Sequence, residues 1–143
     1  MSAEHPARRA GLLSQKYVNE GNREGWLGLF AEDAFVQDPV GPSPLNEDGK
    51  GQIGKGGIAA FYDKFIAPGQ VSFNYPRSYA CGNECAFIGT VYNKFGDMEE
   101  RGSEGVFVYH VDAEGKILSL RAFWEWDRPT LEADIHPPVG RES

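Results

Sequence analysis

Residues 56–75, GGIAAFYDKFIAPGQVSFNY, contain the point at which the spacing of hydrophobic residues changes. Before Pro68 the hydrophobic residues recur every three or four positions, as they do on one face of a helix. After Gly69 they alternate with polar residues, as they do in a strand with one buried face. The helical set is Ile58, Phe61, Tyr62, Phe65 and Ile66, and the alternating set is Val71, Phe73 and Tyr75. The stretch therefore predicts a helix that points Tyr62 inward, ends at Pro68 and leads into a sheet.

Two more helices are expected before this point. Between residues 10 and 18 hydrophobic residues recur at helical spacing, and Ser14 falls on the same stripe, so its hydroxyl should point inward. Asn22 is a suitable N-cap for a second helix. We expect this second helix to end at Glu32-Asp33 and to carry Phe30 on its hydrophobic face.

Three longer strand-like stretches follow the helices, and turn residues separate them. They cover residues 84–95, 98–111 and 116–127. Successive strands joined by short turns pair as antiparallel hairpins. Glycines at positions 89, 102 and 105 favour bends that curl the sheet around a cavity. We therefore predict an α+β fold in which three N-terminal helices pack on a curved antiparallel sheet.

The chain is long enough for one domain, since it has 143 residues of which 41% are hydrophobic. We place this domain at residues 10–127. An N-terminal extension then covers residues 1–9, and a C-terminal tail without periodicity covers residues 128–143.

Composition argues against several classes of function. A formal net charge of −7, without Lys/Arg clusters interleaved with aromatic residues, excludes nucleic acid as a partner. The chain has no hydrophobic run of membrane-spanning length and no signal-peptide core at its start, so we expect no membrane partner and a cytoplasmic location. The three histidines are too scattered to ligate a metal. The Gly49–Gly54 loop matches a dinucleotide pattern but lacks the strand that must precede it, so no cofactor is expected.

The two cysteines, Cys81 and Cys85, bracket a possible tight turn. They are either two small buried residues in a reducing compartment, which we favour, or a pair that faces across the turn.

Asp38 lies between the short hydrophobic stretch 34–36 and Pro39. Proline biases the preceding residue toward an extended conformation, so a stiff backbone directs the Asp38 side chain. A carboxylate held beside apolar neighbours can have a raised pKa and can shuttle a proton. The alternative is an Asp-Pro pair that starts a turn on the surface.

Six segments form a recognisable set across about residues 10–126. They are GNREGW at 21–26, LFAEDA at 29–34, VQDPVG at 36–41, GGIAAFY at 56–62, DAEGKI at 112–117 and RAFW at 121–124. The set resembles the bacterial ketosteroid isomerases of the nuclear transport factor 2-like (SnoaL-like) superfamily, and most of all the actinobacterial steroid delta-isomerase homologues.

The resemblance implies a cone-shaped fold that encloses an apolar pocket, and a homodimer formed through the outer face of the sheet. It implies that Asp38 is the general base, which removes a proton beside a ketone and returns it to a distant carbon without a cofactor. Trp124 matches an aromatic residue beside the base, and Tyr62 matches a tyrosine of the supporting hydrogen-bond network. In this family a tyrosine and a protonated aspartic acid stabilise the intermediate dienolate.

Neither of those two donors stands at its expected position. The tyrosine position falls on Ser14 and the acid position falls on Phe107. Tyr17, one turn after Ser14, and Tyr109, on the face of Phe107, are candidate replacements. Losing one such donor costs about 10²- to 10³-fold in rate, so losing both without replacement would leave a feeble isomerase.

Three hypotheses follow for the function. The first is a ketosteroid isomerase-like enzyme that acts on a steroid-like or polyketide-like enone. The second is a non-catalytic protein that binds a hydrophobic, steroid-like ligand in the same pocket. The third is a polyketide cyclase or dehydratase of the same superfamily. The residues expected to contact the ligand are Ser14, Tyr17, Phe30, Tyr62, Phe107, Tyr109 and Trp124.

Overall fold

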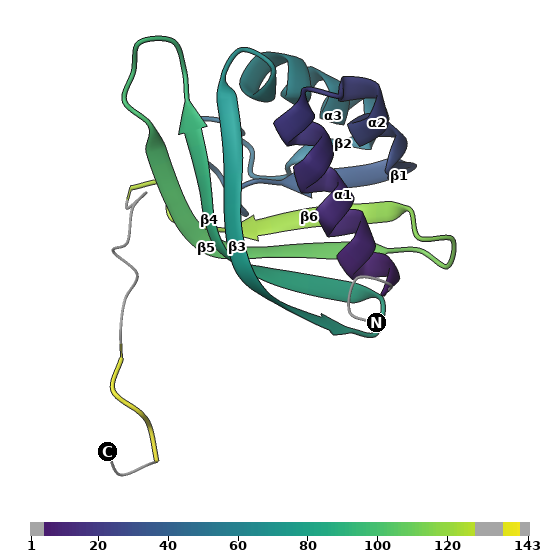
Figure 1. Ribbon diagram of the computed structural model, residues 1–143, viewed down its shortest axis with the longest axis vertical. Coiled ribbons are helices and arrows are strands. Elements are labelled where there is room, and N and C mark those ends of the chain that lie inside the picture. Colours follow the sequence, from purple (N-terminus) through teal and green to yellow (C-terminus); the bar gives the residue numbers. More distant parts are fainter. Residues whose placement is uncertain (1–4, 128–135, 141–143) are drawn as a thin grey trace.

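The computed structural model describes residues 5–127 and 136–140, and in it three helical segments pack on one face of a six-stranded sheet (Figure 1). The helices are α1 (Pro6–Glu20), α2 (Arg23–Gly28) and α3 (Gly54–Phe61), and the π-helix η2 (Tyr62–Ile66) continues α3. The strands are β1 (Phe30–Gln37), β2 (Gln52–Ile53), β3 (Gln70–Cys81), β4 (Glu84–Lys94), β5 (Arg101–Val111) and β6 (Ile117–Phe123). The predicted α+β class, with helices on a curved and mostly antiparallel sheet, is confirmed.

The sheet has the strand order β2-β1-β6-β5-β4-β3. From β3 to β6 each strand pairs with the next in antiparallel fashion, which confirms the predicted hairpins. The parallel pairing of β1 with β6 was not foreseen, and it brings the end of β1 beside the end of β6. Asp38 and Trp124, each of which directly follows one of these strands, therefore lie at the same end of the strand pair.

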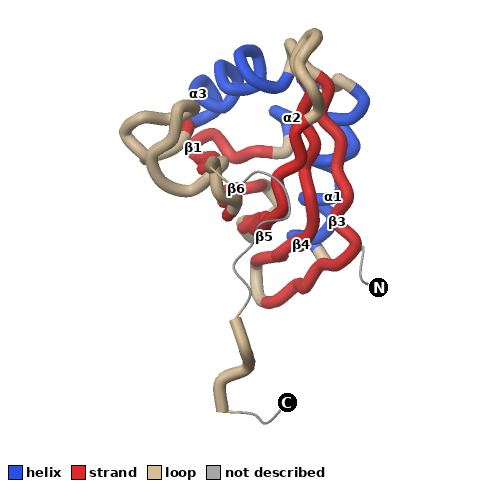
Figure 2. Tube along the Cα trace, turned by 90° about the vertical axis from the view of Figure 1, so that its left-hand side faces the viewer, coloured by secondary structure: helices blue, strands red, loops and turns tan. Residues whose placement is uncertain are grey.

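Glycines mark the line along which the sheet bends. Gly89 of β4 and Gly105 of β5 are cross-strand partners. A Cβ atom on Gly89 would lie 2.1 Å from the carbonyl oxygen of Asn74, and one on Gly105 would lie 2.1 Å from that of Phe123. Only glycine permits backbones to approach this closely. Figure 2 shows the resulting curl of the long strands, which gives the sheet a concave side.

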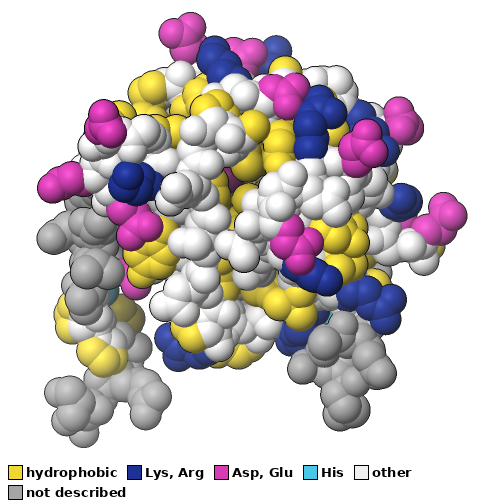
Figure 3. Space-filling model, turned by 45° about the horizontal axis from the view of Figure 1, so that its top comes forward, with side chains coloured by type: hydrophobic (Ala, Val, Ile, Leu, Met, Phe, Trp, Pro, Cys, Tyr) yellow, Lys and Arg dark blue, Asp and Glu magenta, His cyan; other side chains and the backbone are white. Residues whose placement is uncertain are grey.

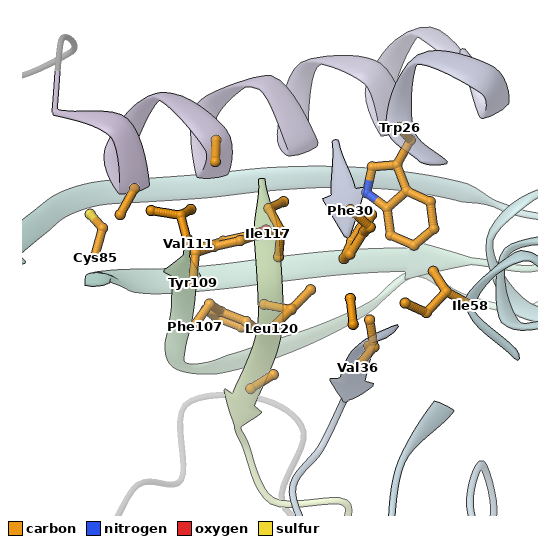
Figure 4. Close-up of a cluster of buried hydrophobic side chains, with 14 of the residues drawn as sticks. Trp26, Phe30, Val36, Ile58, Cys85, Phe107, Tyr109, Val111, Ile117 and Leu120 are labelled. Atoms are coloured by element: carbon orange, nitrogen blue, oxygen red, sulfur yellow. The ribbon is translucent and has the colours of Figure 1, made fainter. Parts of the chain in front are cut away.

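The helices cover that concave side and form the core with it. Helix α1 packs against β3, β4 and β5, whereas α3 packs against β1. Figure 4 shows the buried cluster, in which Trp26 of α2 lies beside Phe30 of β1 and Ile58 of α3 lies on the side of Val36. None of the described helices is long and apolar enough to cross a membrane.

The predicted second helix was wrong beyond Gly28. Asn22 caps α2 as expected, because its side chain accepts a hydrogen bond from the Gly25 amide. The helix then stops, and the Ile117 amide donates to the Leu29 carbonyl at 2.8 Å, so Phe30 begins a strand instead of lying on a helix. A long-range strand partner has overridden a local helical pattern.

The core of the structure includes residues ahead of the predicted start of the domain. Helix α1 begins at Pro6, ahead of the expected domain start at residue 10, and Ala7 is fully buried in the core. Most of the predicted tail lies outside the described residues. Residues 136–140 are exposed and form neither helix nor strand.

Candidate active site

A cavity of about 420 Å³ lies between the concave side of the sheet and the helices. Hydrophobic and aromatic side chains form most of its wall, and Figure 3 shows such side chains gathered around a hollow near the centre of one face. Its polar lining residues are Ser14, Asp38, Lys64, Tyr75, Asn93, Arg101, Ser103 and Tyr109. A largely apolar cavity of this size with a few polar groups suits a small hydrophobic ligand.

Asp38 lines this cavity directly after the end of β1. The Trp124 indole donates a hydrogen bond to Asp38 Oδ1 at 2.5 Å, and the Val40 amide donates to the Ala122 carbonyl at 2.9 Å. These two bonds tie the Asp38 loop to the end of β6. Burial raises the pKa of the Asp38 carboxyl above its ordinary value, and the hydrogen bond from Trp124 offsets part of that rise.

Ser14 is the centre of a buried hydrogen-bond network on another part of the cavity wall. Its Oγ accepts from the Trp26 indole at 3.0 Å and from the Tyr109 hydroxyl at 3.1 Å. All three side chains line the cavity and are nearly inaccessible to solvent. Burial raises the pKa of Tyr109, with the charge of Asp38 adding to the rise and the bond to Ser14 opposing it.

The network holds one more hydrogen than it uses. Trp26, Ser14 and Tyr109 carry three donor hydrogens, and two hydrogen bonds join them. The indole can only donate, so with Ser14 Oγ accepting from both Trp26 and Tyr109 the Ser14 hydroxyl hydrogen is left free, and reversing the Ser14–Tyr109 bond would free the Tyr109 hydrogen instead. Neither hydroxyl bonds to a further acceptor within the described part of the chain. One donor is therefore available to an oxygen atom in the cavity.

Phe107 and Tyr75 form an adjoining aromatic wall. Their rings stack with centroids 4.5 Å apart and an angle of 18° between planes. Burial raises the pKa of Tyr75 well above its ordinary value, so this hydroxyl stays protonated at neutral pH. Phe107 has no polar atom and cannot donate to a ligand.

The cavity brings together most, but not all, of the residues expected to contact a ligand. The four that line it are Ser14, Phe107, Tyr109 and Trp124, and the predicted base Asp38 lines it with them. Tyr17, Phe30 and Tyr62 are not among its lining residues. Phe30 and Tyr62 instead pack on Trp26, with ring centroids 4.8 and 5.4 Å from it, whereas Tyr17 is half-buried against the core.

Three important residues of the site were not expected from the sequence to contact a ligand. Tyr75 belongs to the predicted alternating strand, and this alternation is the sequence signal that could have placed its side chain in the cavity. Trp26 lies on the hydrophobic face of the predicted second helix, but nothing in the sequence connects it to Ser14. Arg101 begins β5 and lines the cavity without any sequence signal.

No group of His, Cys, Asp and Glu suited to a metal ion occurs among residues 5–127 and 136–140. Both cysteines are free thiols. Cys85 is buried, as favoured from the sequence, but Cys81 is exposed because it ends β3 next to the turn.

Comparison with known proteins identifies the family. The model of the SnoaL-like domain matches residues 15–120. A steroid Delta-isomerase of Nocardioides simplex is 33% identical over 124 residues, which cover 87% of this chain and 92% of the isomerase.

Two solved structures from mycobacteria are also similar. The Delta 5-3-ketosteroid isomerase of Mycobacterium sp. is 37% identical with a TM-score of 0.82, over 86% of this chain and 95% of that one. RV0760c of Mycobacterium tuberculosis, in complex with estradiol-17beta-hemisuccinate, is 33% identical with a TM-score of 0.83, over 87% and 97% of the two chains. The family model and the relatives match most of the chain, and the curved sheet and its cavity agree with them. The chain therefore belongs to the SnoaL-like domain family of the nuclear transport factor 2-like superfamily.

Proposed function

We propose that this protein is a ketosteroid isomerase-like enzyme that moves a proton within a steroid-like or polyketide-like enone, with Asp38 as the general base. The observation that carries the proposal is a carboxylate of raised pKa in an apolar cavity that also contains a free hydroxyl donor. A base of raised pKa is a stronger proton acceptor once it is ionised, and a hydroxyl donor stabilises charge on a ketone oxygen.

The reaction needs no electron transfer. Asp38 takes a proton from the carbon between the ketone and the isolated double bond, and the C–H electrons form a dienolate. The negative charge gathers on the ketone oxygen, where the Ser14–Tyr109 pair donates its free hydrogen. Asp38 then returns the proton to the far end of the dienolate, which gives the conjugated ketone.

The Ser14–Tyr109 pair can supply one hydrogen-bond donor in place of the two donors of the family. By the resemblance Ser14 matches the position of the donor tyrosine, and the Trp26 indole donates a hydrogen bond to its Oγ. Phe107 leaves the second donor position without a polar group. With one donor in place of two, we expect an isomerase slower by about 10²- to 10³-fold than a member with both.

The cavity and the relatives support the proposed class of ligand. The apolar wall suits a rigid ring system, and the similar proteins include a steroid isomerase and a structure with a bound estradiol derivative. A steroid-like ketone is therefore the substrate class that we propose.

We also propose that the protein is a homodimer that pairs through the outer face of the sheet. Side chains there alternate with the buried ones of β4 and β5, and Ile88, Val106 and Val108 lie together on adjacent strands. Tyr79 and Phe123 at the margins are 61% and 43% exposed. An apolar face of this kind is typical of a surface that binds another chain.

The experiment monitors conversion of a β,γ-unsaturated 3-ketosteroid to its conjugated isomer by ultraviolet absorbance. Asp38→Asn preserves the shape of the side chain and an oxygen that can accept from Trp124, but removes the base. We expect it to lower kcat by about 10²- to 10⁴-fold. Asp33→Asn is the matched control, because it removes the same charge from an exposed position on β1. Equal turnover by wild type and Asp38→Asn would refute the proposal.

The second candidate is a binding protein without catalysis, and the apolar Phe107 favours it because a donor is missing there. It predicts that wild type and Asp38→Asn bind the steroid with similar affinity, detected by tryptophan fluorescence, and that neither turns it over. A cyclase or dehydratase of the superfamily predicts turnover of polyketide-like substrates instead of steroids.

A further inference from the structure

The open end of the cavity carries positive charge. Asn93 of β4 and Arg101 of β5 are cross-strand partners, and both side chains line the cavity. Lys64 lines it from η2 and is exposed to solvent, as is the nearby lining residue Phe95. Ser14, by contrast, is 3% exposed, so the cavity has an enclosed end and an open one.

Arg101 uses few of its hydrogen-bond donors. Its Nη2 donates to the Trp126 carbonyl, and its guanidinium lies over the Trp126 ring at 4.6 Å from the centroid. Its Nε is shielded from solvent and has no hydrogen-bond partner. No ion pair joins Arg101 to an acidic side chain within the described ranges 5–127 and 136–140. A guanidinium has five N–H donors, and apart from the shielded Nε the Nη groups still have N–H bonds that a ligand can use.

The charge around the cavity is opposite to that of the chain as a whole. The chain has a formal net charge of −7, yet the charged residues that line the cavity are Lys64, Arg101 and Asp38. Two of these three are cations, and Asp38 is engaged by Trp124 on the β6 side. A partly buried cation with no anionic partner is costly unless a ligand supplies one.

We infer that the ligand carries a carboxylate at the end that lies in the mouth of the cavity, where Arg101 and Asn93 bind it. Its apolar body then fills the cavity, and its ketone reaches the enclosed end, where Ser14 and Tyr109 lie; this orientation rests on the proposed isomerase function. A carboxylate is favoured because its two oxygens match the planar fork of a guanidinium. The Asn93 amide adds a neutral donor beside the fork. Lys64 contributes as a charge at the rim.

The test compares two probes that share one ring system and differ at a single carboxyl group, which is ionised in one and carries a methyl ester in the other. They are estradiol-17β-hemisuccinate and its methyl ester, and their dissociation constants are measured by tryptophan fluorescence and calorimetry at low and high salt. Because both probes share one ring system, the ratio of the two constants reports the change at the carboxyl group, and its change in the Arg101 variants reports the contact with Arg101. We expect wild type to bind the acid at least about tenfold more tightly than the ester.

Arg101→Leu should bring that ratio close to one, and Arg101→Lys should keep part of the preference, since it keeps the charge but not the fork. Lys94→Gln is the matched control. It removes a cation from the end of β4 that lies next to Arg101 of β5, but Lys94 does not line the cavity and donates to the Gly96 carbonyl. We expect it to retain the wild-type ratio. Circular dichroism and thermal unfolding of each variant identify any that does not fold, in which case Arg101→Lys carries the comparison.

Three results would overturn the inference. They are a wild-type ratio near one, a ratio that Arg101→Leu leaves unchanged, and a loss in Lys94→Gln as large as that in Arg101→Leu. The isomerase assay on a neutral ketosteroid separates the two proposals. Turnover without a preference for the acid overturns the carboxylate site alone, whereas a preference for the acid without turnover overturns the isomerase alone.

Discussion

Replacing Ser14 by alanine should harm both stability and catalysis, because Ser14 Oγ is the shared acceptor of two buried hydrogen bonds. The Tyr109 hydroxyl can turn toward the cavity, and losing its bond costs about 1 kcal/mol. The Trp26 indole can only donate and stays buried, so its unpaired N–H adds about 1–2 kcal/mol. We therefore expect Ser14→Ala to lower the free energy of unfolding by about 2–3 kcal/mol.

Tyr109→Phe should be milder. It removes a donor but leaves Ser14 paired with Trp26, so we expect a loss of about 1 kcal/mol. Urea unfolding followed by fluorescence and circular dichroism measures both variants. Ser72→Ala, an exposed serine on the outer face of β3, is the control and should change the free energy of unfolding by less than about 0.5 kcal/mol.

The rates complete the test. Each single variant leaves one hydroxyl that can still donate, so we expect kcat to fall by only about tenfold in each. The double variant has no free hydroxyl in this network, and we expect kcat to fall by about 10²- to 10³-fold. A double variant with the kcat of wild type, or a Ser14→Ala protein as stable as wild type, would refute the reasoning.

Four further predictions concern other parts of the molecule. Activity should rise with pH as Asp38 ionises, and the apparent pKa in kcat/KM should lie above the ordinary value of 3.8, because burial raises the pKa of this carboxyl. The same shift means that the stability contributed by Asp38 is present at low pH and is lost as pH rises through the raised pKa. Urea unfolding should therefore show that the stability of Asp38→Asn increases relative to wild type toward neutral pH. Trp124→Phe should raise the apparent pKa of kcat/KM, because it removes the hydrogen bond that favours the ionised Asp38 carboxylate. An unchanged apparent pKa would contradict this. Gly89→Ala should lower the free energy of unfolding by at least about 1–3 kcal/mol, because the new Cβ meets a backbone oxygen, whereas Gly56→Ala in α3 meets nothing and should be neutral or stabilising in the same measurement. Val108→Glu should convert the proposed dimer to monomer in light scattering, because it puts a charge in the apolar outer face; a wild type that is already monomeric would contradict the dimer.

The sequence alone indicated the helix before Pro68 and the strands after it, because hydrophobic periodicity is a local property, but it did not predict β1 or β2. The change of period at Pro68-Gly69 predicted the last helix and the strand after it, and the glycines inside the strands predicted the bend. The same local reasoning singled out Asp38, since its neighbours in the chain stiffen its backbone and make its surroundings apolar.

The tertiary structure alone decided which side chains meet. The second helix ends at Gly28 because β6, far along the chain, supplies a strand partner for β1. Ser14 is 12 residues from Trp26 and 95 from Tyr109, and no local pattern encodes contacts over such separations. The position of Arg101 in the cavity likewise depends on the register of β4 with β5. Hydrophobic periodicity predicts which face of a helix or strand a side chain lies on. The curvature and register of the sheet set the distances between side chains on which a reaction depends.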